Sequence, residues 1–275
     1  MNKANLDIIK EIQEKVKSYL QEHSIKALII GISGGFDSGF NAAILRPICD
    51  ELNIPLIGTF IHIDSNKKEE LERANAIGDA FCTEYSFLNM TEEYNHLNRL
   101  LNPELADKDK KDCSRSELIR MGNIKCRLRM IALYNLAQEN GGIVVDNDNK
   151  TERMLGFWTI GGDIGDITPL ASFYKTELYE LAKSYVETLS NDNEKEALQS
   201  VIDAVPTDGL GITSSDVEQF GVATYNEVDE VLKWIENHSE TYKACPYKEE
   251  SGSAKVWHRW KNSEFKRNHP HRIIL

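Results

Sequence analysis

Several features common in other protein classes are missing from this chain of 275 residues. No apolar run near the N-terminus has the length of a signal peptide, and no run elsewhere is long enough to cross a bilayer. The five cysteines are an odd number without a Cys-x-x-Cys pair, which argues against a disulfide framework or a structural zinc site. We therefore expect a soluble, cytoplasmic protein with reduced thiols and no membrane contact.

Positive charge is scarce. Lys and Arg number 32 against 44 Asp and Glu, so the formal net charge is −12. Such a surface repels a phosphate backbone, and we expect no nucleic-acid partner. The segment 255–275 is the exception, because it is rich in Lys and Arg interleaved with Trp257, Trp260 and Phe265. It is predicted as a basic tail, either solvated or forming a local site for an anionic ligand.

Helical periodicity alternates with short apolar runs. Apolar residues follow helical spacing over 5–22, 38–53, 66–82, 117–139, 173–188 and 193–203. Runs typical of strands cover 26–32, 55–63, 84–88 and 142–146. This succession predicts an α/β fold, an open parallel sheet with helices on both faces. With 41% hydrophobic residues we expect a single domain over 1–275, with mobile loops at 103–117 and 237–254.

A glycine- and serine-rich stretch follows the first predicted strand and opens a helix. It reads Gly31-Ile32-Ser33-Gly34-Gly35-Phe36-Asp37-Ser38. Glycines let backbone N–H groups approach a phosphate, the helix N-terminus adds positive charge, and Asp37 can hold Mg²⁺. The absence of GxxxxGK[ST], and of GxGxxG after a strand, argues against a P-loop NTPase and a dinucleotide-binding Rossmann site. As composition alone, Ser-Gly-Gly is also typical of a turn and N-cap.

Residues 33–38 resemble the SGGxDS pyrophosphate-binding motif of the N-type ATP pyrophosphatases, which adenylate a carboxylate or carbonyl group. Further segments are similar, in the same order, to motifs of one family in that group, the ammonia-dependent NAD synthetases. They are 122–130 (family GNxKARxRM), 148–152 (GNKSE), 155–159 (LGYFT), 162–176 (GD…D..PL….KT), 206–210 (PTxxL), 224–229 (SYxEID) and 263–267 (SEHKR). The resemblance spans roughly residues 26–272, and so many spaced motifs make coincidence a poor explanation.

The resemblance implies a Rossmann-like, adenine nucleotide alpha hydrolase-like fold and an ATP-dependent amide ligation. Deamido-NAD would be adenylated on its nicotinate carboxylate, and ammonia would then displace AMP to give NAD. ATP as substrate, Mg²⁺ as metal and a homodimer are implied as well. Glutamine-using relatives carry an added amidase domain for which 275 residues leave no room, so free ammonia, or ammonia from a partner protein, is expected.

The resemblance also implies roles for individual residues. The implied catalytic residues are Asp37, Asp166 and Lys175. ATP would be bound by the stretch from Gly31 to Ser38 together with Asn147, Lys175 and Thr207. Deamido-NAD would be bound by Arg127, Asp166, Phe265 and Lys266. Mg²⁺ would be held by Asp37 and Glu152.

Plainer interpretations exist for several of these residues. Residues 149–152 read as an N-cap with a capping-box glutamate, Arg127 as a partner in a helix-surface salt bridge, and Thr207 as part of a turn. Asp163 is equally typical of a loop. Lys175 lies near a predicted helix start, where a cation is unfavourable against the helix dipole, so it requires an anion such as an ATP phosphate.

Three positions depart from the family pattern: Asn147 replaces threonine, Ile160 replaces lysine and Phe265 replaces histidine. Losing a lysine removes a charge-assisted contact, commonly about 1.5–3 kcal/mol. We therefore expect substrate recognition to be reorganised or weaker, with Trp158 and Phe265 stacking in place of hydrogen bonding. A relative that adenylates another carboxylate or carbonyl substrate, or a nucleotide-binding module without turnover, stays open as an alternative.

Overall fold

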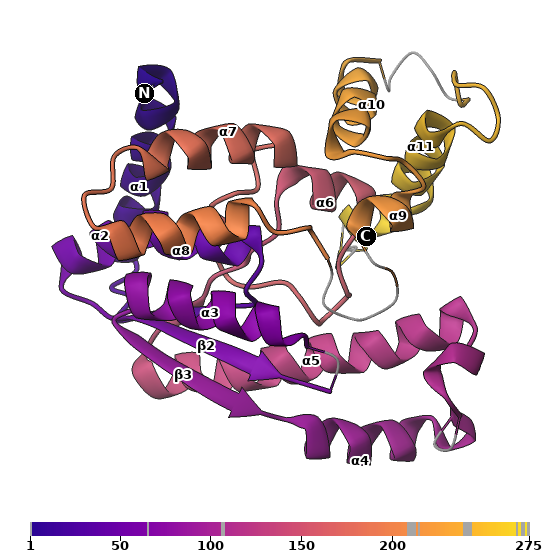
Figure 1. Ribbon diagram of the computed structural model, residues 1–275, viewed down its shortest axis with the longest axis horizontal. Coiled ribbons are helices and arrows are strands. Elements are labelled where there is room, and N and C mark those ends of the chain that lie inside the picture. The colour runs from indigo at the N-terminus through magenta and orange to yellow at the C-terminus, as the bar shows by residue number, and fades with distance from the viewer. Residues whose placement is uncertain are drawn as a thin grey trace.

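A parallel sheet forms the centre of the fold in the computed structural model (Figure 1). The structure describes residues 2–64, 66–105, 108–207, 213, 215–238, 244–267, 269–270 and 273. In these residues the strands are β1 (Leu28–Gly31), β2 (Leu56–His62), β3 (Glu84–Asn89) and β4 (Ile143–Val144), in the order β3-β2-β1-β4. Every pairing is parallel, with Leu28 opposite both Leu56 and Ile143. The predicted strands and the predicted α/β fold class are confirmed.

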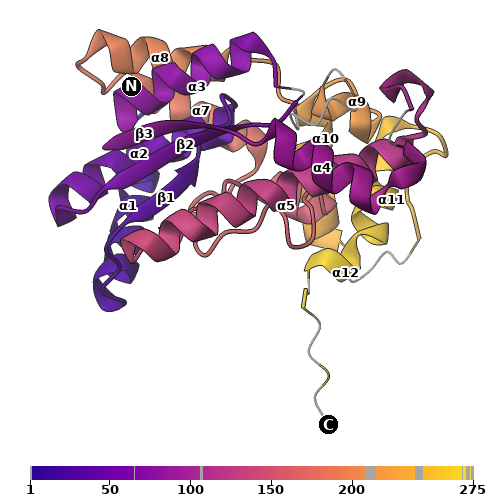
Figure 2. The ribbon, with the colours of Figure 1, turned by 90° about the horizontal axis from the view of Figure 1, so that it is seen from below.

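Helices cover both faces of the sheet (Figures 1 and 2). One face is covered by α1 (Lys3–Glu22), α2 (Phe36–Leu52), α3 (Lys68–Phe81), α7 (Lys175–Val186) and α8 (Asp192–Ile202). The other face is covered by α4 (Thr91–Leu101) and α5 (Arg115–Asn140). The six predicted helices are all present within a few residues of their expected ends, whereas α4 was not predicted.

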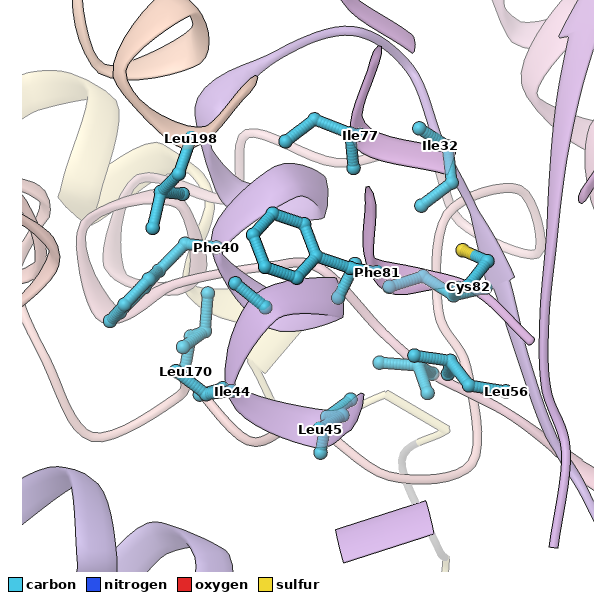
Figure 3. Close-up of a cluster of buried hydrophobic side chains, with 14 of the residues drawn as sticks. Ile32, Phe40, Ile44, Leu45, Leu56, Ile77, Phe81, Cys82, Leu170 and Leu198 are labelled. Atoms are coloured by element: carbon cyan, nitrogen blue, oxygen red, sulfur yellow. The ribbon is translucent and has the colours of Figure 1, made fainter. Parts of the chain in front are cut away.

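Successive side chains of β1 pack on opposite faces of the sheet. Leu28 and Ile30 belong to the cluster under α2, and Ile29 belongs to the cluster under α5. Figure 3 shows the first cluster, in which Phe40 of α2 and Phe81 of α3 lie among aliphatic side chains. Burying one such side chain is worth about 1.5–3 kcal/mol. The strand is thus clamped between two cores, and its carboxyl end is held in a defined place.

A third apolar cluster joins the C-terminal helices beside the sheet. It involves α6 (Lys150–Leu155), α9 (Asp216–Phe220), α10 (Tyr225–His238) and α11 (Gly252–Asn262), together with Tyr174 just before α7. The helix α12 (Glu264–Arg267) follows α11. Val256 is fully buried and Trp257 is 6% exposed. Of the two alternatives for the segment from 255, solvation therefore does not describe α11, because its apolar residues pack against α6 and α10. A local site for an anionic ligand stays a prediction.

The predicted loops are shorter than expected. Within 103–117 the chain forms 3-10 helices η1 (Pro103–Leu105) and η2 (Lys110–Asp112), and α5 already begins at Arg115 behind a Ser114/Glu117 capping box. Within 237–254, α10 runs to His238 and α11 begins at Gly252. Residues 106–107 and 239–243 lie outside the described part, and the mobility of both segments stays a prediction.

None of the described helices is long and apolar enough to span a lipid bilayer.

Candidate active site

A cavity of about 630 Å³ opens at the carboxyl end of the sheet. The strand order reverses between β1 and β4, and such a reversal is where open parallel sheets place their ligands. The lining includes residues 31–38, parts of α5, residues 147–148, residues 156–160, and single residues from later segments. All eight residues of the predicted phosphate-binding stretch line it, as do Asn147, Glu152, Lys175 and Thr207. The ATP side predicted from the sequence therefore converges on one space.

The loop between β1 and α2 is held by its own serines. The Ser38 hydroxyl lies 3.0 Å from the Ser33 hydroxyl and donates to the Gly35 carbonyl over 3.2 Å. The Gly35 N–H donates to Ser33 Oγ over 3.1 Å. No side chain caps α2 behind Gly35, so the first N–H groups of this helix point to the cavity without a side-chain acceptor. The serines thus shape the loop, and they leave its backbone and the helix end available to an anion.

Gly34 is the position in this loop that requires glycine. Its φ is +77°, and a Cβ added there would lie 2.0 Å from the Glu70 carbonyl oxygen. We expect Gly34→Ala to lower the melting temperature more than Gly141→Ala. Gly141 has a similar φ of +59°, but its Cβ would meet only ordinary contacts at 3.5 Å from Lys26 Cγ. The control should carry only the left-handed backbone cost of about 1–2 kcal/mol. Equal decreases in the melting temperature of the two variants would contradict a special requirement for glycine at position 34.

Three ionisable side chains meet at the loop. Lys175 Nζ forms an ion pair with Asp37 and lies 3.8 Å from Glu152 Oε1. Asn149 joins the two carboxylates, since its Nδ2 donates to Asp37 Oδ1 and its backbone N–H donates to Glu152 Oε2, each over 3.0 Å. Helices α2, α6 and α7 thus bring one cation and two carboxylates together.

The capping-box interpretation of residues 149–152 is confirmed, and the metal role of Glu152 stays a prediction. Asn149 and Glu152 form a capping box at the start of α6, and Glu152 also lines the cavity. The predicted need of Lys175 for an anion is met by carboxylates of the chain itself. Mg²⁺ in proteins is commonly coordinated by one or two carboxylates, with substrate phosphates and water as its other ligands. The carboxyl groups of Asp37 and Glu152 fit this kind of coordination. No group of three His, Cys, Asp or Glu that could enclose a metal occurs in the described part of the chain.

The protonation of Glu152 should make stability depend on pH. Burial raises the pKa of Glu152 from 4.5 to about 8, and the charge of Asp37 adds to the rise. The folded state then keeps a proton that the unfolded state loses, so this contribution is complete below about pH 4.5 and is lost as the pH rises through about 8. In metal-free buffer, Glu152→Gln should lose less stability than the parent over this window, by up to about 1.4 kcal/mol per pH unit. Urea unfolding at several pH values measures the difference, and parallel curves would refute it.

Two cations that were predicted to bind deamido-NAD, Arg127 and Lys266, lie beside the loop after α6. The Arg127 guanidinium donates to the Ile160 carbonyl over 3.1 Å and 3.3 Å. Lys266 Nζ donates to the carbonyls of Gly156, over 2.7 Å, and Trp158. Burial, together with the charge of Arg259, lowers the pKa of Lys266. Both predicted cations line the cavity and are oriented by carbonyls of the loop after α6.

Two predicted substrate contacts lie elsewhere. Asp166 is absent from the described lining; its Oδ2 accepts from the Val144 N–H over 2.8 Å and its Oδ1 from the Tyr134 hydroxyl over 3.3 Å. Phe265 is 63% exposed and also lies outside the lining. The predicted stacking by Phe265 is therefore not formed within the cavity of one chain, and it stays a prediction. A substrate role for either residue stays a prediction.

Several lining residues were not assigned from the sequence. Asp148, Asp216 and Arg259 line the cavity, as does Asp163, whose carboxylate accepts from the Thr159 N–H over 2.7 Å. Burial, with Asp146 nearby, raises the pKa of Asp148. Arg259 was within reach of the sequence, because the excess of cations from 255 pointed to an anion. Asp148 stands in the segment 148–152 that resembles a family motif, whereas Asp216 had no comparable local signal.

Comparison with known proteins agrees with this geometry. A family model described as NAD synthase matches residues 8–270. The NH(3)-dependent NAD(+) synthetase of Finegoldia magna is 33% identical over 245 residues, which are 88% of this chain and 88% of that protein. The predicted resemblance is confirmed, and the alternative of a different carboxylate or carbonyl substrate is not favoured.

Solved structures share the fold. The NMN synthetase from Francisella tularensis superposes with a TM-score of 0.74 at 23% identity, covering 98% of this chain and 97% of that one. The NH3-dependent NAD synthetase from Campylobacter jejuni has a TM-score of 0.72 at 21% identity and full coverage of both chains. Since the family model covers nearly the whole sequence and a curated relative exceeds 30% identity, the chain belongs to the NAD synthase family.

Proposed function

We propose that this chain uses ATP to ligate ammonia to the nicotinate carboxylate of deamido-NAD, releasing NAD, AMP and pyrophosphate. The observation that carries the proposal is a single cavity with two chemically different sides. We call one set of lining residues the phosphate side; it consists of the lysine-free loop 31–38 with Asp37, together with Glu152 and Lys175. We call the other set the acid side; it consists of Arg127 and Lys266. An anionic nucleotide and an anionic acid can therefore meet in the same space.

The phosphate side would hold ATP through backbone N–H groups of the loop and the N-terminus of α2, helped by Lys175. Asp37 and Glu152 would hold Mg²⁺, with Asn149 keeping both carboxylates in place. When bound, the metal supplies positive charge to the phosphate oxygens. Asn147 donates to the Gly31 carbonyl over 3.2 Å and so fixes the end of β1 beside the nucleotide.

The acid side would present the nicotinate carboxylate to the α-phosphorus of ATP. An oxygen of the carboxylate forms a bond to this phosphorus as the bond to the leaving pyrophosphate breaks. Ammonia then forms the C–N bond at the carbonyl carbon, a proton leaves the nitrogen, and the C–O bond to AMP breaks. The chain contributes orientation and charge, and no covalent protein intermediate is needed. Arg127 and Lys266 would keep the anionic substrate close to its target.

The predicted partners follow from the same proposal. The chain would use free ammonia or ammonia from a partner protein, and it would act as a homodimer in which a second copy meets the part of deamido-NAD outside this cavity. The positions of Asp166 and Phe265 outside the cavity lining of one chain support that arrangement. The five free cysteines support a cytoplasmic location, where thiols stay reduced. Sedimentation with and without deamido-NAD tests the dimer.

The function is tested by incubating the protein with ATP, Mg²⁺, ammonium and deamido-NAD. We expect NAD and AMP in equal amounts, and no NAD when ammonium is omitted. Nicotinate mononucleotide should be offered in competition, because its amidation would give the NMN named for the Francisella protein. A clear preference for the mononucleotide would replace the proposed substrate, and ADP as the product would reject adenylation altogether.

A further inference from the structure

Asp229 is a buried carboxylate outside the cavity that joins two helices of the phosphate side. It lies on α10, is 2% exposed and is absent from the described lining. Its Oδ1 accepts a hydrogen bond from Thr151 Oγ1 of α6 over 2.5 Å, and its Oδ2 accepts from the Thr176 N–H of α7 over 2.9 Å. A buried charge is costly unless it is hydrogen-bonded, so these two bonds hold Asp229 and both helices in one arrangement.

The bonds also complete the N-terminus of α7. This helix begins at Lys175, and the N-cap residue Tyr174 forms no side-chain cap. The Lys175 N–H donates instead to Thr151 Oγ1 over 2.9 Å, and the next N–H, from Thr176, donates to Asp229. The negative charge of Asp229 faces the positive end of the helix dipole, where the charge of Lys175 is unfavourable. Asp229 thus stabilises the N-terminus of α7, which begins with the cation of Lys175.

Each group bonded to Asp229 is next in sequence to a residue of the phosphate side. Thr151 precedes Glu152, and Thr176 follows Lys175. Glu152 and Lys175 lie 3.8 Å apart across the junction of α6 and α7. Breaking the bonds to Asp229 would release the backbone of α7 beside Lys175 and the side chain of Thr151 beside Glu152. A displacement of about 1 Å at such a group can lower a rate by about 100-fold.

We propose that Asp229 is a positioning residue for adenylation, which sets the separation of Glu152 and Lys175 by bonding the backbone of α7 and the side chain beside Glu152. The inference rests on the proposed function. Arg127 and Lys266 are oriented by the loop after α6, whose carbonyls they bond directly. Loss of Asp229 should therefore affect kcat and the response to Mg²⁺ more than the KM for deamido-NAD.

The test compares Asp229→Ala and Asp229→Asn with Glu236→Gln as the matched control. Glu236 is also on α10 and bonds Lys150 over 2.7 Å and the Tyr174 hydroxyl over 3.0 Å, but it does not bond the backbone beside Lys175. We expect Asp229→Ala to lower kcat by about 100-fold and to raise the Mg²⁺ concentration for half-maximal rate. It should also reduce the rise in melting temperature produced by ATP and Mg²⁺. Asp229→Asn should recover part of each effect, and Glu236→Gln should leave all three measurements unchanged.

A merely structural role gives a different result. It would reduce the amount of folded protein but leave the Mg²⁺ midpoint and the ligand-induced shift of the folded molecules unchanged, and that outcome overturns the inference. Should Asp229→Ala fail to fold, Thr151→Val removes the linking hydroxyl with little change of shape, and an unaltered Mg²⁺ midpoint would overturn the inference equally. The unmodified protein is assayed first: absence of AMP formation rejects the proposed function, whereas normal AMP formation in the variants rejects only the role of Asp229.

Discussion

Replacing Asp37 by asparagine should lower the rate of AMP formation by about 100- to 1,000-fold, the usual loss when one preorganised charge-stabilising group is removed. Asparagine preserves the size of the side chain and can still accept from Asn149, which donates to Asp37 Oδ1 over 3.0 Å. It loses the charge that pairs with Lys175 and that would hold Mg²⁺. The expected result is a folded protein that binds deamido-NAD but scarcely adenylates it, measured as AMP released per folded molecule.

The matched control for this variant is Asp50→Asn, which lies on the same helix. Asp50 is exposed, bonds Arg46 over 2.8 Å and does not belong to the described lining. Exposed ion pairs of this kind contribute at most about 1 kcal/mol to stability, and we expect a normal rate of AMP formation. If Asp37→Asn retained most of its activity, or if both variants lost it equally, the placement of Asp37 at the reacting phosphate would be wrong.

The phosphate side could be predicted because its signals are local. An apolar strand, a glycine turn and a helix start lie within a few residues, and the parallel sheet brings this segment next to the one after β4. The capping box of α6 and the helix-start cation Lys175 were also visible in the sequence, and both are present. Lys175 pairs with Asp37 and lies near Glu152, and its contact with an ATP phosphate stays a prediction.

The acid side could not be predicted to the same depth because it depends on contacts between distant segments. Arg127 is oriented by the backbone carbonyl of Ile160. Replacement of the family's lysine by isoleucine at position 160 therefore matters less for Arg127 than the position of this carbonyl. Asp166 bonds the N–H of Val144 at the sheet edge, a pairing that no local pattern indicates. Asp229 and Thr151 are likewise 78 residues apart in sequence, and only the packing of α10 on α6 brings them together.

Replacing Lys175 by methionine should also abolish most activity, and its combination with Asp37→Asn should be less damaging to stability than the two single changes added together. Lys175 is almost fully buried, and its ammonium contacts one carboxylate and approaches another. Methionine leaves Asp37 and Glu152 facing each other without a cation, whereas asparagine leaves the lysine with only its longer contact to Glu152. Breaking a buried pair on one side costs about 3–5 kcal/mol, because a charge remains without its partner. The double variant removes both charges at once, so we expect a favourable coupling of up to about 3 kcal/mol.

Urea unfolding of the unmodified protein, both single variants and the double variant measures this coupling, with activity assayed on the same preparations. Lys183→Met is the matched control, because Lys183 lies on the same helix and its side chain, 57% exposed, pairs with Glu180 over 2.9 Å. It should change neither stability nor rate appreciably. Strict additivity of the stability changes would mean that Lys175 and Asp37 act independently. The lysine would then serve the nucleotide alone, and Asn149 would have to hold the two carboxylates together without its help.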